Sequence, residues 1–144
     1  MGLRQILFGA LMWAVFIYAL RRGGWAERVA AGSTVLGTYL TLLTASPSTI
    51  RFKHVETPVM LVDMAVLLVL LAISLRSNKF WPLWLTAMQG LTVFAHLSPF
   101  IPHMLPWAYW RASAVWSWLK LIVLAYAIHR HHLEQVARSR FRFR

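Results

Sequence analysis

Charged residues are scarce in this chain, and most of them lie at the borders of long apolar stretches. Asp, Glu, Lys and Arg make up 13% of its 144 residues, about half of the ~25% that is usual in a soluble domain. The last seven positions, by contrast, hold four Arg: Arg138, Arg140, Arg142 and Arg144. Apolar stretches with basic borders and a basic tail are typical of a polytopic membrane protein. A polar residue inside such a stretch needs a partner, because hydrocarbon supplies none.

Five segments have, or nearly have, the ~17 to 25 residues that a membrane-spanning helix needs. They cover about 3–20, 27–45, 57–76, 80–97 and 106–129. The second is the least apolar, because Ser, Thr and Gly dilute it, so four spans are the alternative to five. The first is read as a retained helix, because Arg21-Arg22 follow it and no small-residue cleavage site does. We therefore predict an all-α membrane bundle in one domain over 1–132, with a basic tail at 133–144.

The distribution of Lys and Arg favours five spans, with the N-terminus outside and the C-terminus in the cytoplasm. Five spans place ten basic residues on the inner side and four on the outer side, whereas four spans give eight and six. We expect a bacterial inner membrane as the location. The net charge of +11 then reflects topology and attraction to anionic lipids, so no nucleic-acid partner is expected.

The end of the tail alternates Arg with Phe. Alternation of this kind is typical of an extended strand. We expect the tail to lie extended on anionic headgroups, or to contact an acidic partner.

Polar residues inside the third, fourth and fifth segments predict a buried network. Asp63 lies roughly 9 Å from the outer end of its helix, and antiparallel packing brings His96 to the same depth. Arg111 falls in that layer too. Lys120 lies deeper, near the level of Gln89. These five residues form the candidate site, because an intramembrane charge costs ~3 kcal/mol or more without a partner.

The alternative reading of these residues is structural. Asp63 would then pin helices together through Arg111 or His96, and the long stem of Lys120 would reach the inner interface. Ser33, Gly37 and Thr41 on the second segment have the spacing that lets membrane helices pack closely. They could instead line a polar path.

No cofactor is predicted, although haem and quinone stay open as alternatives. The chain has no Cys. A haem in a membrane usually needs two His residues on facing helices as axial ligands, and among the His residues of this chain only His96 lies well inside a segment. A metal site of Asp63, His96 and His103 would depend on a loop. A quinone pocket needs an apolar cleft with one or two polar groups, which His96 and Asp63 could supply beside Trp107 and Trp110.

Three functions follow from these patterns. The chain lacks a Gly-rich phosphate loop, His-Glu-x-x-His and Gly-x-Ser-x-Gly, which favours a non-catalytic role. The first hypothesis is an accessory or assembly subunit of a larger inner-membrane complex, with other membrane subunits as partners. The second is a small oligomeric transporter or proton-coupled carrier that uses Asp63 beside His96. The third is a redox module that binds quinone or haem.

Overall fold

The described part of the chain is entirely helical apart from turns and short connections. The computed structural model describes residues 2–45, 57–97, 100 and 106–142, the last range with side chains from 114 to 141. Its five helices are α1 (Leu3–Arg22), α2 (Trp25–Thr44), α3 (Thr57–Arg76), α4 (Trp81–Ala95) and α5 (Pro106–Arg142). The prediction of an all-α fold with five helices is confirmed.

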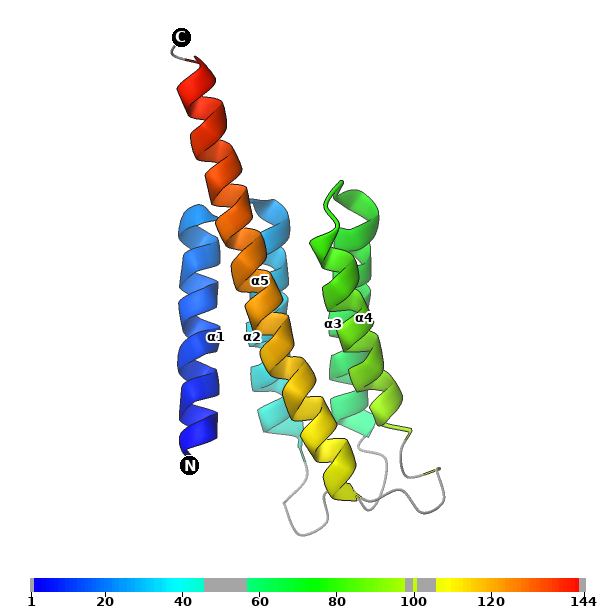
Figure 1. Cartoon of the computed structure of the whole chain (residues 1–144). Coiled ribbons are helices and arrows are strands. Elements are labelled where there is room, and N and C mark those ends of the chain that lie inside the picture. The colour runs from blue at the N-terminus through cyan, green and yellow to red at the C-terminus, as the bar shows by residue number, and fades with distance from the viewer. Residues whose placement is uncertain (1, 46–56, 98–99, 101–105, 143–144) are drawn as a thin grey trace.

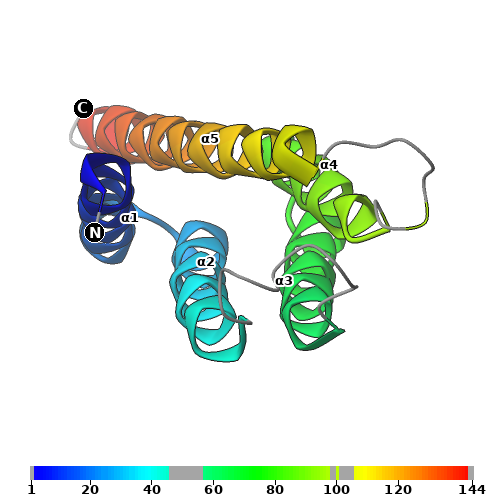
Figure 2. The same ribbon diagram turned by 90° about the horizontal axis from the view of Figure 1, so that it is seen from below.

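The helices run alternately up and down and close into a ring. Figure 1 shows α1 starting at the end where the N-terminus lies and α5 ending beyond the opposite end. Each helix packs on the next, and α5 packs back on α1. Seen along the bundle, α1 to α4 form an arc that α5 crosses (Figure 2). Residues distant in sequence therefore meet inside one ring.

The fifth helix corrects the prediction for the tail. The tail was predicted to be extended, but α5 continues through it to Arg142. No Gly or Pro follows His129 to end the helix, and Arg130 pairs with Glu134 one turn later. Such a pair adds a few tenths of a kcal/mol to a helix, and the absence of Gly and Pro lets the helix continue into the residues that alternate Arg with Phe. The last turns of α5 project beyond the other helices (Figure 1).

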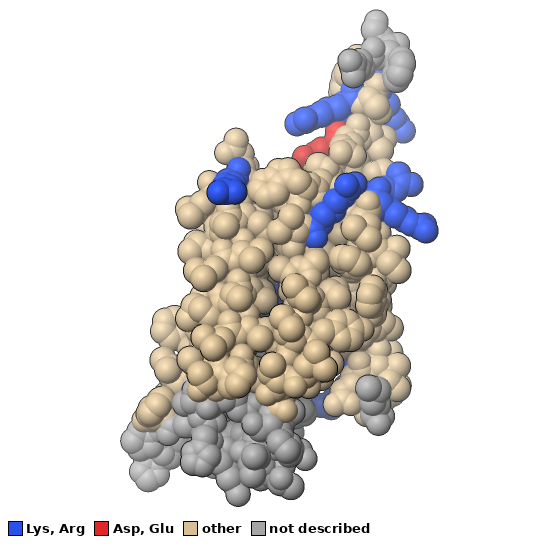
Figure 3. Space-filling view, turned by 180° about the vertical axis from the view of Figure 1, so that it is seen from behind, with Lys and Arg blue, Asp and Glu red and all other residues tan. Residues whose placement is uncertain are grey.

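Exposed Arg side chains gather at the end of the bundle from which α5 projects. They are Arg21 and Arg22 on α1, Arg28 on α2, Arg76 on α3 and Arg130 on α5. Figure 3 shows this gathering on one face, above a body that is mostly uncharged. We call this end the basic end, and the opposite one the N-terminal end.

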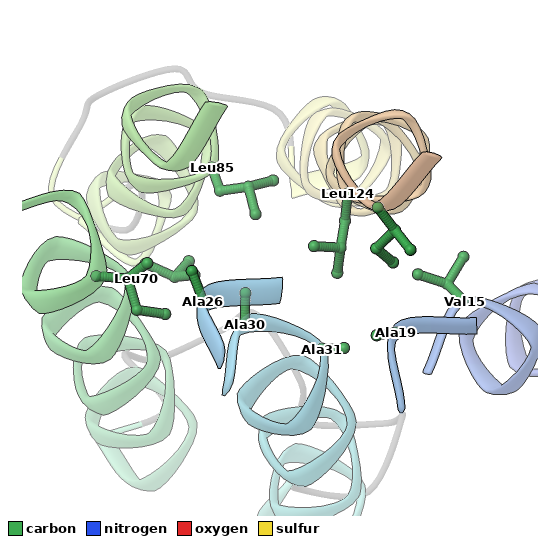
Figure 4. Close-up of a cluster of buried hydrophobic side chains, with 10 residues drawn as sticks. Val15, Ala19, Ala26, Ala30, Ala31, Leu70, Leu85 and Leu124 are labelled. Atoms are coloured by element: carbon green, nitrogen blue, oxygen red, sulfur yellow. The ribbon is translucent and has the colours of Figure 1, made fainter. Parts of the chain in front are cut away.

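Apolar side chains from all five helices fill the bundle toward the basic end. Leu70, Leu85, Leu124 and Ile128 are at most 2% exposed and pack on small residues of α1 and α2. Figure 4 shows Leu70, Leu85 and Leu124 pointing inward from α3, α4 and α5 toward the side of the bundle where Ala26, Ala30 and Ala31 lie. The alanines let the helices come close here.

A glycine brings α2 and α3 together nearer the N-terminal end. A Cβ atom at Gly37 would lie 2.6 Å from Cγ2 of Val66, closer than packed atoms come. Gly37 therefore has the packing role expected of small residues at that spacing.

Two of the described helices, α1 and α3, are long and apolar enough to cross a membrane by length and composition. A core helix of a soluble protein or a signal sequence would also pass this test. Here, however, only 17% of the apolar window of α1 and 22% of that of α3 are buried, so most of these side chains face outward. The finding supports membrane association, and five spans remain a prediction.

The contact at Gly37 leads to a stability prediction. Gly37→Ala should destabilise the bundle by about 1–3 kcal/mol, because its methyl group overlaps the stiff side chain of Val66. Gly90→Ala is the matched control, since its Cβ meets nothing within 4 Å. Thermal unfolding in detergent, followed by circular dichroism, measures both variants. An unchanged melting temperature for Gly37→Ala, or no recovery on adding Val66→Ala, would contradict the proposed overlap.

Candidate functional site

Gln89 on α4 and His96, which directly follows α4, hold the carboxylate of Asp63 in the second turn of α3. Gln89 Nε2 donates hydrogen bonds to Asp63 Oδ1 at 3.0 Å and to the Asp63 backbone carbonyl at 3.1 Å. His96 Nε2 donates to Asp63 Oδ2 at 2.8 Å. Both carboxylate oxygens are thus engaged.

Gln89 also carries the network across to α5. Lys120 Nζ donates to Gln89 Oε1 at 2.5 Å. The amide nitrogen of Gln89 therefore faces the anion on α3, and its oxygen faces the cation on α5. One neutral side chain links the two opposite charges.

Helical spacing explains why these groups share one region. Gln89, Thr92 and His96 lie three and four residues apart, which places them on one face of the helix and at its end. His96 directly follows the last residue of α4, in a helical conformation. Because α3 and α4 are antiparallel neighbours, this face meets the early turns of α3, where Asp63 lies.

The network is largely withdrawn from the surface. Gln89 is 1% exposed, and the side chains of His96 and Asp63 are 7% and 18% exposed. A buried charge without a partner is strongly destabilising. The hydrogen bonds from Gln89 and His96 supply the partners that Asp63 needs.

A cavity of about 270 Å³ adjoins the network on the inside of the ring. All four polar residues of the network reach it, and hydroxyl groups from α2, α4 and α5 surround them. Its lining consists of Phe8, Thr34, Gly37, Thr38, Thr41, Leu42, Val59, Asp63, Val66, Gln89, Thr92, His96, Ser117 and Lys120. All five helices contribute to it.

The threonines of the lining offer oxygen acceptors. Thr34, Thr38 and Thr92 donate their hydroxyl hydrogens to backbone carbonyls one turn earlier on their own helices. Their oxygens keep lone pairs for another donor. With an ammonium, an imidazole and a carboxylate nearby, the cavity has both donors and acceptors for a small polar molecule.

The structure brings together four of the five predicted site residues: Asp63, Gln89, His96 and Lys120. The backbone of Arg111 belongs to α5, but its side chain lies outside the described residues. His54 and His103 also lie outside them, as do the side chains of Trp107 and Trp110. Within the described residues, no group of three or more His, Asp or Glu is placed to hold a metal ion. The quinone and haem hypotheses stay predictions.

A second polar cluster, at the basic end, was not predicted. Glu27, which is fully buried, accepts a hydrogen bond from Lys79 Nζ at 2.5 Å, and Lys79 Nζ also lies 3.0 Å from His131 Nδ1. The sequence offered one signal, since Glu27 is the third residue after the Gly23-Gly24 turn, a position suited to capping a helix. Its ion-pair partner, Lys79, lies 52 positions away along the chain.

Comparison with known proteins does not assign this chain to a group. No protein-family model, curated protein or solved structure matches it. Its function must be argued from the geometry of the cavity and its network.

Gln89 is the position whose loss should affect the network most. Gln89→Leu should destabilise the fold by about 3 kcal/mol, because Asp63 and Lys120 each lose a buried partner. Thr92→Val, one turn away, should cost about 1 kcal/mol or less, because that hydroxyl bonds only within its own helix in the described structure. Unfolding of both variants in detergent measures the difference. Equal stability of the two would contradict the bridging role of Gln89.

Proposed function

We propose that this protein is a five-span integral membrane carrier that binds a small polar solute in its central cavity and couples it to a proton. The observation that carries the proposal is the cavity itself, which adjoins the linked side chains of Asp63, His96, Gln89 and Lys120. Polar and charged side chains from three helices thus converge on one space inside the bundle.

The outer surface supports the membrane setting. On α3, large apolar side chains at Leu61, Leu68 and Leu75 are 60%, 59% and 79% exposed. A helix that is apolar all round is typical either of a buried core or of a membrane span. Because few residues of α3 are buried, the membrane span is the alternative that fits this helix. Each helix of 20 residues is about 30 Å long, which matches the hydrocarbon thickness of a bilayer.

The other helices, over their described residues, do not meet the combined criterion of length and hydropathy. Helix α4 has only 15 residues, and α2 includes the charged residues Glu27 and Arg28. Several of their other polar residues, Thr34 and Thr38 on α2, Gln89 on α4 and Lys120 on α5, line the cavity. Polar residues of membrane helices usually face such an interior. The proposal therefore includes α2, α4 and α5 among the spans, with the basic end in the cytoplasm.

The cavity and its charges define what the carrier would take. A volume of about 270 Å³ corresponds to roughly nine water molecules, which suits a solute of a few heavy atoms. Asp63 and Lys120 carry opposite charges, and the imidazole of His96 lies beside Asp63. Imidazole is the side chain most suited to passing protons in a carrier, so an anionic solute would enter together with a proton, whereas a cationic solute would enter as a proton leaves.

The test is solute-dependent proton movement in proteoliposomes. Vesicles loaded with a pH-sensitive dye are offered short carboxylates, small amines and neutral amides one at a time. The wild-type protein should move protons with one of these classes. Asp63→Asn should fall to the level of protein-free vesicles while keeping its helical circular dichroism, because the charge that holds His96 is gone.

Ser74→Ala is the matched control for this experiment. Ser74 also lies on α3 and contacts α4, through a hydrogen bond with Thr86 at 2.9 Å, but it does not line the cavity. This variant should keep wild-type flux. Proton movement that no solute stimulates, or that survives in Asp63→Asn, would overturn the carrier proposal.

A second candidate is the accessory or assembly subunit that the sequence alone favoured. The observation in its favour is the projecting end of α5, where Arg138, Arg140 and Phe141 are exposed. A basic helix that extends from a bundle can bind an acidic surface of a partner.

The subunit proposal predicts a loss of partners on charge reversal. Replacing Arg138 and Arg140 by Glu should release partner chains that co-purify with the wild-type protein after gentle solubilisation, because complementary charges become repulsive. Native mass spectrometry of both forms measures the ratio of chains. A wild-type protein that runs only as itself would exclude this second candidate.

A further inference from the structure

Three layers follow one another along the bundle: the cavity, an apolar layer and a polar cluster. The cavity with Asp63, Gln89 and Lys120 lies toward the N-terminal end. An apolar layer follows, in which Leu70, Leu85 and Leu124 meet the alanines of α2 (Figure 4). The cluster of Glu27, Lys79 and His131 lies beyond it, at the basic end. On α5, about 16 Å of helix separates Lys120 from His131.

The cluster at the basic end joins three parts of the bundle through one cation. Lys79, in the turn between α3 and α4, contacts Glu27 Oε1 on α2 and His131 Nδ1 on α5. Because Lys79 donates to that nitrogen, His131 accepts there. Its other ring nitrogen lies 3.0 Å from the side-chain amide of Gln135. Lys79 thus holds the turn against two helices at once.

The cluster has a tightly buried side and a side open to water. Glu27 is 0% exposed, whereas the side chain of Lys79 is 31% exposed. Glu27 is fixed in place, because its second oxygen accepts a hydrogen bond from the Gly24 N–H at 3.1 Å. Lys79, and not Glu27, is therefore the member of the ion pair that water reaches. The movable part is the turn between α3 and α4.

Two buried polar atoms in this turn point to a second arrangement. Ser77 Oγ and Trp81 Nε1 are buried and have no hydrogen-bond partner among the described residues. Outward movement of the turn would give both atoms access to water.

We infer that Glu27, Lys79 and His131 form the gate that closes the cavity from the basic end, with the apolar layer as the barrier behind it. This inference rests on the proposed carrier function, because a gate serves a site that must open to two sides. An apolar constriction blocks polar solutes by excluding water, and the ion cluster holds the helices around it. Release of Lys79 lets the turn and the start of α4, which carries Leu85, move outward.

The test uses a feature of the sequence: the chain has no Cys, so one introduced thiol reports on one position. Thr38→Cys places it in the cavity lining. A membrane-impermeant maleimide is applied to inside-out and to right-side-out vesicles. From the side of the basic end, labelling should be slow, because the gate and the apolar layer lie between.

Gate variants should open this path. Lys79→Gln removes the central cation, and Glu27→Gln removes the charge while an amide oxygen still caps Gly24. Each variant should speed labelling of Thr38→Cys from the basic end by about tenfold or more. The labelling rate follows the population of the open state, which is at most ~10% when the closed state dominates and would become the major state in the variants. Arg76→Gln, an exposed Arg at the end of α3, is the control and should change nothing.

The outcomes separate the gate from the carrier proposal, because labelling needs no solute. Unchanged labelling in two folded gate variants would overturn the gate, and so would an equal rise in Arg76→Gln. Faster labelling in the gate variants alone supports the gate, even if no solute drives proton movement. Helical circular dichroism and a single size-exclusion peak establish folding, and either gate variant suffices if the other does not fold.

Discussion

The polar interior of this bundle depends on the side-chain amide of Gln89. Its nitrogen donates to Asp63 and its oxygen accepts from Lys120, at 3.0 and 2.5 Å. An amide in this position keeps the carboxylate and the ammonium from pairing directly, yet leaves neither buried charge without a partner. The cavity lies beside this bridge, and Asp63, Gln89 and Lys120 all line it.

Much of the network could be predicted because helix geometry fixes depth. Counting residues from the helix ends placed His96 beside Asp63 and Lys120 beside Gln89, and both contacts are present. Depth alone does not fix rotation about the helix axis, however. The direct bond from Gln89 to Asp63, which joins the two levels, therefore did not follow from the sequence. The helix bounds were close for the same reason, since α3 covers the predicted 57–76.

The parts that were not predicted depend on contacts between distant residues or on competing local signals. Glu27 and Lys79 lie at the ends of apolar segments in the sequence, and only the packing of distant helices brings them together at a buried site. In the tail, the alternation of Arg and Phe competed with a run that has no Gly or Pro, and the helix prevailed. Both cases show that border residues of membrane-like segments need to be tested against their neighbours across the bundle.

The continuity of α5 ties the two polar clusters together mechanically. Lys120 and His131 lie about three turns apart on one helix without Gly or Pro between them, so both face the interior on the same side. If α5 rotated as a rigid rod, both side chains would leave their partners together, and the bundle would lose two networks in one step. If the turn that carries Lys79 swung outward instead, the hydrogen bond between Lys120 and Gln89 would be untouched. Helix α5 therefore stays in place, and a conformational change that costs little free energy involves only α3, α4 and the turn between them.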